Sequence, residues 1–121
     1  MNIRVIILGA WIWFEKDSNK LVGRAGLRVL DLEGKQVIDV GYILLPEFWN
    51  KGFATEMAAA SIEIAFELLK LKELVCFTSV TNKSSQRVME KIGFKYDRDF
   101  IYADKPNVLY RLTSDVYHNT K

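Results

Sequence analysis

The chain has 121 residues and a mass of 14.0 kDa, which suits a single domain, residues 1–121, and is too short for two independent cores. Half of its residues are hydrophobic and 26% are charged, a composition that excludes an intrinsically disordered chain. Seventeen Lys and Arg against fifteen Asp and Glu leave a net charge of +2 without a basic block, so we expect no nucleic-acid partner. With one cysteine, Cys76, and one histidine, we expect no disulfide framework, no metal site and a reducing, cytoplasmic compartment.

The first long apolar run covers residues 5–14. It has about half the length that a membrane-spanning helix requires, so we expect no membrane partner. Its β-branched and aromatic side chains favour a strand, with a break at Gly9. A secretion signal is the alternative interpretation, although no small-residue cleavage site follows the run; Glu15, Lys16 and Asp17 come instead.

The first third of the chain has the pattern of an antiparallel meander. Three apolar segments are separated by polar turns, and they cover residues 11–14, 21–30 and 36–45. The second turn contains Gly34, which can take a positive φ. Pro46 ends the third segment because proline lacks the N–H that a strand interior needs.

The period then changes from that of a strand to that of a helix. Apolar side chains recur at helical spacing from Thr55 onward, with Ser61 completing the stripe that Met57, Ile64, Leu68 and Leu71 form. We predict an amphipathic helix over residues 55–71.

A buried strand and a second, shorter helix follow. The strand covers residues 74–80, and the helix covers residues 83–92. Asn82 offers an N-cap side chain, and Gly93 suits the position after the last helical residue.

The last part of the chain predicts a hairpin, residues 94–113, with its turn at residues 103–107, and then a polar tail. The resulting order is β-β-β-α-β-α-β-β. It predicts an α/β (α+β) fold: a mixed, mostly antiparallel sheet with two main helices, built on residues 9–113.

The loop before the first helix has the pattern of an anion site. Gly52 and Ala54 open the helix, and such small residues leave backbone N–H groups uncovered at its positive end. Lys51 adds a positive charge beside them. The alternative is a plain loop-to-helix transition, because a lone Gly-x-Ala is a weak motif.

Taken together, two blocks resemble the GNAT superfamily of acetyl-CoA-dependent N-acetyltransferases. The similarity is greatest to the branch of the ribosomal-protein alanine and serine N-acetyltransferases. The residues that carry the resemblance are IDVGY at 38–42, WNKGFATE at 49–56 and NKSSQRVMEKIGF at 82–94, with LVG at 21–23 on the second strand.

The sequence departs from the family pattern at four places. Trp49 stands where the superfamily usually has Gln or Arg, and Asn50 stands where the ribosomal-type branch usually has glycine. Met89 replaces a tyrosine that many members use as an acid. Family members also carry a strand and two helices before the meander, where this chain has at most eight residues.

The resemblance implies acetyl-CoA as cosubstrate and assigns its binding residues. Backbone amides would hold the pyrophosphate, a strand edge would pair with the pantetheine arm, and an amide at Leu44 or Leu45 would polarise the thioester carbonyl. Asn82 would bond the pantetheine or phosphate side. The binding residues implied are Ile43, Leu44, Leu45, Lys51, Gly52, Phe53, Ala54, Thr55, Asn82 and Ser85.

Two residues are candidates for catalysis. Ser85 matches the family position proposed to serve the departing thiolate; the alternative is a first-turn helix serine. Asp39 could orient a water that deprotonates the amine; the alternative is a strand residue facing solvent. Tyr42 and Tyr102 are possible donors or packing residues, and Cys76 is expected in the core.

The sequence thus predicts an acetyltransferase acting on a primary amine, either a protein N-terminus or a small molecule. The alternative is a shortened GNAT-like module that binds CoA or a partner without catalysis. Because the front elements of the family are not found before residue 9, residues 5–14 would expose an apolar edge, and we expect a homodimer. Residues 1–8 folding back as a first strand is the alternative.

Overall fold

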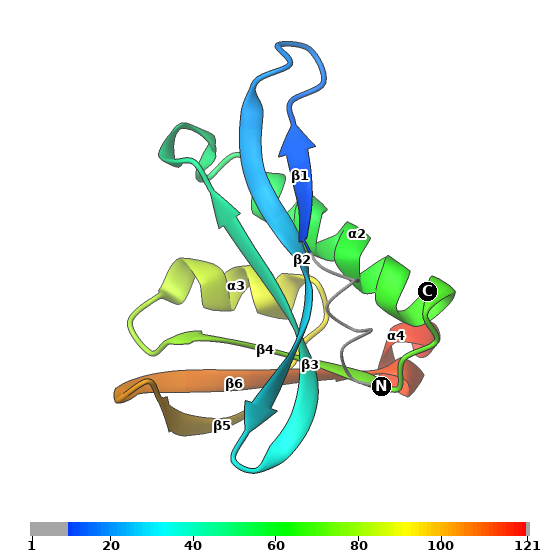
Figure 1. The fold of residues 1–121 in the computed structure, drawn as a ribbon, viewed down its shortest axis with the longest axis vertical. Coiled ribbons are helices and arrows are strands. Elements are labelled where there is room, and N and C mark those ends of the chain that lie inside the picture. Colours follow the sequence, from blue (N-terminus) through cyan, green and yellow to red (C-terminus); the bar gives the residue numbers. More distant parts are fainter. Residues whose placement is uncertain (1–9, 121) are drawn as a thin grey trace.

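The structure, a computed structural model, describes residues 10–120. Within them one six-stranded sheet has the order β1-β2-β3-β4-β6-β5 (Figure 1). All neighbours are antiparallel except β3 and β4, which are parallel. The strands are β1 (Ala10–Phe14), β2 (Leu21–Leu32), β3 (Lys35–Leu44), β4 (Glu73–Ser79), β5 (Lys95–Tyr102) and β6 (Lys105–Thr113).

Two main helices complete the predicted mixed fold. They are α2 (Phe53–Glu63), which a π-helical turn, η2 (Ile64–Leu68), extends, and α3 (Lys83–Lys91). A short 3₁₀ helix, η1 (Pro46–Phe48), follows β3, and α4 (Ser114–Asn119) ends the described chain. The predicted order of strands and helices is confirmed. The predicted break at Gly9 and the fold-back of residues 1–8 lie outside the described residues.

The sheet divides where β3 meets β4. Across the part of the chain that the structure describes, these strands pair at one position, Asp39 with Val75, whereas β2 and β3 pair along ten positions from Gly23–Leu44 to Leu32–Lys35. Beyond Asp39, β3 leaves β4, and in Figure 1 the two halves of the sheet run in different directions, with α3 in the angle between them. This divergence opens the inside of the sheet.

Both main helices cover one face of the sheet. Ile62 and Phe66 from the α2–η2 segment and Met89 from α3 pack with Val40 and Cys76 in one buried cluster. This burial confirms Cys76 as a core residue.

The opposite face carries its own apolar cluster. It contains Val37 of β3 beside Val75, Phe100 and Leu109. Since side chains alternate along a strand, the β3 residues that share Val37's face are Asp39, Gly41 and Ile43.

The first helix differs from the predicted stripe at its end. Ser61 is buried and donates its hydroxyl to the Met57 carbonyl (3.0 Å), as a core position requires. Leu68, predicted in the same stripe, is 73% exposed. The π-helical turn is the reason, because its extra residue rotates the following side chains around the axis.

The interpretation of residues 114–121 as a polar tail is wrong for the described part. Ser114–Asn119 form α4, which Thr113 caps through a bond from the Val116 N–H (3.3 Å). Tyr117 stacks on Phe66 with ring centroids 4.9 Å apart. A helix that stacks a half-buried aromatic ring on the core in this way is stabilised more than its polar residues suggest.

The last hairpin is also tighter than predicted. Its turn contains two residues, Ala103 and Asp104, rather than five, and both have positive φ (52° and 63°). Two residues with φ above zero match the right-handed twist of the flanking strands.

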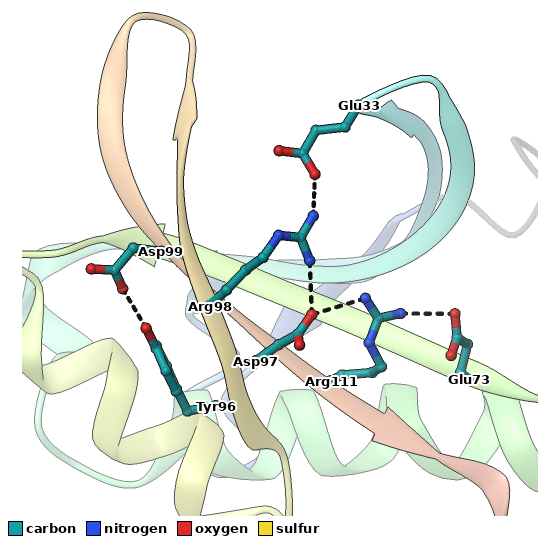
Figure 2. Close-up of polar contacts among 7 residues, drawn as sticks. All are labelled: Glu33, Glu73, Tyr96, Asp97, Arg98, Asp99 and Arg111. Atoms are coloured by element: carbon teal, nitrogen blue, oxygen red, sulfur yellow. Dashed lines mark hydrogen bonds and ion pairs between the residues drawn. The ribbon is translucent and has the colours of Figure 1, made fainter.

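A chain of ion pairs ties the hairpin to the rest of the sheet (Figure 2). Arg98 contacts Glu33, in the turn after β2, and Asp97 (2.9 Å). Arg111 contacts Asp97 (3.0 Å) and Glu73 (2.9 Å). Partly exposed pairs contribute little each, about 0–1 kcal/mol, so the chain mainly orients the β2–β3 turn over β5.

Gly23 marks the closest approach of β2 to β3. A Cβ built there would lie 2.1 Å from the Ile43 carbonyl oxygen and 2.9 Å from the Leu44 Cα, which are backbone atoms. At Gly41, on the neighbouring strand, a Cβ would meet nothing within 4 Å. A side chain is therefore excluded at the first position and accommodated at the second.

We predict that Gly23→Ala lowers the free energy of unfolding by roughly 1–3 kcal/mol, because the two strands must separate to admit a methyl group. Gly41→Ala is the matched control and should stay within about 0.5 kcal/mol of the wild type. Urea unfolding followed by circular dichroism measures both. Equal stability of the two variants would contradict the close approach.

Candidate functional site

A cleft of about 1110 Å³ lies where β3 and β4 diverge. β2 and β3 form one wall, β4 and α3 form the other, and the start of α2 closes one end. Residues from all three parts line it, among them Asp39, Tyr42, Gly52, Asn82 and Ser85. Residues from both sequence motifs, 49–56 and 82–94, and both candidate catalytic residues therefore line the same cleft.

The start of α2 presents free backbone donors to this cleft. Gly52 is the N-cap residue with φ 87° and ψ −4°, and its carbonyl accepts the first helical bond from the Glu56 N–H (3.1 Å). The amides of Phe53, Ala54 and Thr55 precede that bond, and no side chain caps the helix. Such amides, at the positive end of the helix dipole, favour an anion.

Trp49 lies at the same end of the cleft as these amides. Its indole N–H donates to the Leu44 carbonyl (3.0 Å), while the residue as a whole is 58% exposed and lines the cleft. The indole therefore anchors the loop to the end of β3, a role that needs the N–H as well as the ring.

The hydrogen bonds of β3 decide whether the Leu44 or the Leu45 amide is free to donate into the cleft. The Leu45 N–H donates to the Val22 carbonyl (2.9 Å) and is therefore used within the sheet. Successive amides of a strand point to opposite sides, so the Leu44 N–H points away from β2, toward the cleft. Of the two amides considered from the sequence, Leu44 is the available one.

Asn82 and Ser85 occupy the first turn of α3. The Asn82 Oδ1 accepts from the Ser85 N–H (3.0 Å), so the predicted cap is present. The Ser85 hydroxyl lies 3.0 Å from the Tyr42 hydroxyl of β3, which brings the two walls of the cleft together. Burial raises the pKa of Tyr42 while the bond to Ser85 lowers it, and the net shift is upward, so the phenol keeps its proton near neutral pH.

Asp39 lies at the narrow end, where β3 and β4 last pair. Its side chain is 4% exposed, so the interpretation as a solvent-facing residue is wrong. Arg28 binds it through two contacts, Nε to Oδ1 (2.9 Å) and the second guanidinium nitrogen to Oδ2 (3.3 Å). Burial raises the pKa of Asp39 above its ordinary 3.8, and Arg28 opposes that rise without cancelling it.

The cleft has two sides with different chemistry. Tyr42 shares the face of Val40, which the helices cover, and there it meets Ser85. Asp39 and Arg28 lie on the other face. An opening through the sheet thus connects a hydroxyl pair on one side with a carboxylate on the other.

Several other residues considered from the sequence have packing roles. Met89 is buried in the core cluster, and Tyr102 packs against Phe77 with centroids 4.7 Å apart. The ion pair of Arg28 and the Tyr42–Ser85 contact were not anticipated. The first follows from strand register, whereas the second requires the packing of α3 and had no signal in the sequence.

Residues 5–95 match the family described as Acetyltransferase (GNAT) domain. The match covers most of the chain and includes the cleft. The chain belongs to the GNAT acetyltransferase family.

Curated relatives agree with this assignment. The chain is 29% identical over 104 residues to "Uncharacterized protein YkkB" of Bacillus subtilis, covering 86% of this chain and 60% of that protein. It is 33% identical over 90 residues to "Putative ribosomal N-acetyltransferase YdaF" of the same organism, covering 72% and 49%. The chain therefore spans about half the length of the curated relatives it matches.

Solved structures share the fold. An acetyltransferase from Agrobacterium tumefaciens superposes with a TM-score of 0.73 at 29% identity, covering 86% of this chain and 60% of that one. A spermidine N-acetyltransferase SpeG mutant from Vibrio cholerae gives 0.78 at 17% identity, covering 92% and 68%. The second likeness concerns the fold alone. Among residues 10–120, no helix has the length and apolar character that crossing a membrane requires.

The Arg28–Asp39 pair makes stability depend on pH. We predict that Arg28→Ala lowers the free energy of unfolding at pH 7 by roughly 1–3 kcal/mol, because a buried carboxylate loses its partner. The folded-state pKa of Asp39 is already raised, and removing Arg28 raises it further. Protonated Asp39 contributes its full stabilisation at a pH below the pKa that Asp39 has in the unfolded chain. This contribution is lost as the pH rises through the higher pKa that Asp39 has in the folded chain.

The difference between Arg28→Ala and wild type should therefore be small below pH 3.8 and grow as pH rises. Arg24→Ala, on the same strand and face, is the matched control and should show little change at either pH. Urea unfolding between pH 3 and 7 measures this. A deficit that is independent of pH would mean that Arg28 stabilises the sheet without acting on Asp39.

Proposed function

We propose that this protein transfers an acetyl group from acetyl-CoA to a primary amine, a protein N-terminus or a small amine. One observation carries the proposal: the uncapped start of α2 and the free edge of β3 open into the same cleft as Ser85 and Asp39. The names of relatives such as "Uncharacterized N-acetyltransferase YoaA" from Bacillus subtilis support it.

The proposal assigns donors to two parts of acetyl-CoA, the pyrophosphate and the pantetheine arm. The amides of Lys51, Gly52, Phe53, Ala54 and Thr55, with the charge of Lys51, would bind the pyrophosphate. The edge of β3 at Ile43, Leu44 and Leu45 would receive the pantetheine arm alongside it, with the Leu44 N–H as the free backbone donor. Asn82 would bond the same arm from the opposite wall.

The chemistry requires a neutral amine, a polarised carbonyl and a protonated leaving group. Asp39 orients a water that passes one proton from the ammonium to solvent, and the neutral amine nitrogen then attacks the thioester carbon. The same water carries the second nitrogen proton to solvent as the amide forms. The Leu44 N–H stabilises the negative charge that develops on the carbonyl oxygen. When the carbon–sulfur bond breaks, the Ser85 hydroxyl gives its proton to the thiolate and regains one from Tyr42, which solvent reprotonates.

The cofactor site gives a direct binding prediction. Gly52→Val should abolish acetyl-CoA binding measured by calorimetry, because the side chain would cover the amides at the start of α2. Gly52 has φ 87°, so valine also strains the backbone. Gly34→Val is the matched control, since Gly34 has φ 84° and likewise lacks neighbours, but lies in the β2–β3 turn. Unchanged affinity in Gly52→Val would remove this loop from the cofactor site.

The hydroxyl pair gives a kinetic prediction. Ser85→Ala should lower the rate of thiol release by about 10²-fold or more, the range expected for general acid catalysis, while acetyl-CoA affinity changes little. Tyr42→Phe should have a smaller effect in the same direction, because Ser85 keeps its own proton. If both variants turn over at the wild-type rate, Ser85 is left with its place in the first turn of α3 and no part in the reaction.

A non-catalytic module that binds CoA or a partner is the second candidate. Met89 supports it, because it stands where many family members have a tyrosine acid and is buried in the core. Acetyl-CoA binding without thiol release, tested with peptides and small amines, would favour this candidate over the enzyme.

We also propose a homodimer in the cytoplasm. β1 is the end strand of the described sheet, and Ile12 and Phe14 on it are more than half exposed, which suits an interface. The buried thiol of the one cysteine suits a reducing compartment. We predict a dimer mass by light scattering at micromolar concentration, and a monomer mass that persists on concentration would contradict the dimer.

A further inference from the structure

The register of β2 and β3 places charged and small residues in rows on the face away from the helices. Arg28 pairs with Asp39, Gly26 with Gly41 and Arg24 with Ile43. All six line the cleft.

The central row lacks side chains. Gly26 and Gly41 are Cα partners; Gly26 is buried, whereas Gly41 is exposed and a Cβ there would meet nothing within 4 Å. The part of this glycine floor above Gly41 is therefore open. It leads from the Arg28–Asp39 pair toward Arg24.

The charges around the cleft are mostly positive. Its charged lining residues among those described are Arg24, Arg28, Arg87 and Asp39. Asp39 is already neutralised by Arg28, and Arg87 lies on α3. Arg24 is exposed and makes no ion pair within residues 10–120. Its guanidinium lies beside the open floor, with no carboxylate partner in the described part of the chain.

We propose that the amine acceptor carries a carboxylate close to its amine, and that Arg24 determines this specificity by binding the carboxylate. The inference rests on the proposed acetyl transfer. With the amine near Asp39, the acceptor crosses the glycine floor, and its carboxylate pairs with the guanidinium, which suits carboxylates in two-point contacts.

The spacing sets the size of the acceptor. Arg24 and Arg28 are four residues apart on one strand, about 13 Å between Cα atoms, and the arginine side chain spans part of that distance. A peptide N-terminus followed by acidic residues fits this span. A free acidic amino acid also fits, because the Arg24 side chain covers part of the distance between the two strand positions. A polyamine would place a second positive charge beside Arg24, which is unfavourable.

The test compares acceptors that differ only in charge. Thiol release from acetyl-CoA is measured with the peptides Ala-Glu-Glu-Ala and Ala-Lys-Lys-Ala, free glutamate and spermidine. We expect kcat/KM for the acidic peptide to exceed that for the basic one by about 10-fold or more, the range that one good charge pair provides. Arg24→Glu should reverse this order.

Two variants complete the design. Lys35→Glu makes the same change of charge at the start of β3, outside the cleft, and should leave the peptide preference unchanged. Gly41→Val fills the open floor and should lower kcat/KM for the acidic peptide without weakening acetyl-CoA binding. Faster turnover of the peptide than of glutamate identifies an N-terminus as the acceptor, and the reverse identifies a small amino acid; both support the proposal.

Binding separates this inference from the proposed function. Calorimetry with the CoA-loaded protein should show tighter binding of the acidic peptide, lost in Arg24→Glu. If that holds while no acceptor releases thiol, acetyl transfer fails and the carboxylate site stands. Equal affinity and turnover for the two peptides, a preference for spermidine, or loss of CoA binding itself in Arg24→Glu would overturn the proposal.

Discussion

The divergence of β3 from β4 is the constraint on which the site depends. Two parallel neighbours that stayed paired would fill the middle of the sheet with ladder hydrogen bonds and leave no opening. In this protein the pairing stops at Asp39 and Val75, so the outer edge of β3 keeps backbone groups that a ligand can use. The starts of α2 and α3 then face the same opening, which is why two distant motifs meet.

The position of Asp39 follows from the same constraint. A carboxylate at the last paired position is enclosed by both strands, and burial alone would favour its neutral form. Arg28, which remains more than half exposed, supplies the opposing charge from the neighbouring strand. The pair thus holds a carboxylate in place at the narrow end of the cleft, at a cost in desolvation that other residues of the sheet must offset.

Local signals in the sequence predicted most of the fold. Periodicity identified the strands and both main helices, and the roles of Asn82 and Gly93 at the ends of α3 are confirmed. Errors occurred where a longer-range contact outweighed local composition. Leu68 is turned outward by a π-helical turn, and the polar residues after Thr113 form a helix because Tyr117 can stack on Phe66.

The candidate site was predictable in part. The loop at Gly52 and the turn at Asn82 carry their own backbone signals, which need no tertiary information. The burial of Asp39 depends on which residue lies opposite it, and the contact of Tyr42 with Ser85 depends on how α3 packs against the sheet. Neither of these can be derived from the period of a single segment.

The two-residue turn at Glu33 and Gly34 has a consequence for how this family member can evolve. Both residues have positive φ (54° and 84°), and the turn fixes every pairing between β2 and β3. Inserting or deleting one residue there would shift the register and move Arg24 and Arg28 to the helix-covered face. The β1–β2 connection, residues 15–20, can vary in length without changing how β2 pairs with β3. The face on which Arg24 and Arg28 lie is therefore insensitive to the length of the β1–β2 loop and linked to the length of the β2–β3 turn, at the opposite end of β2.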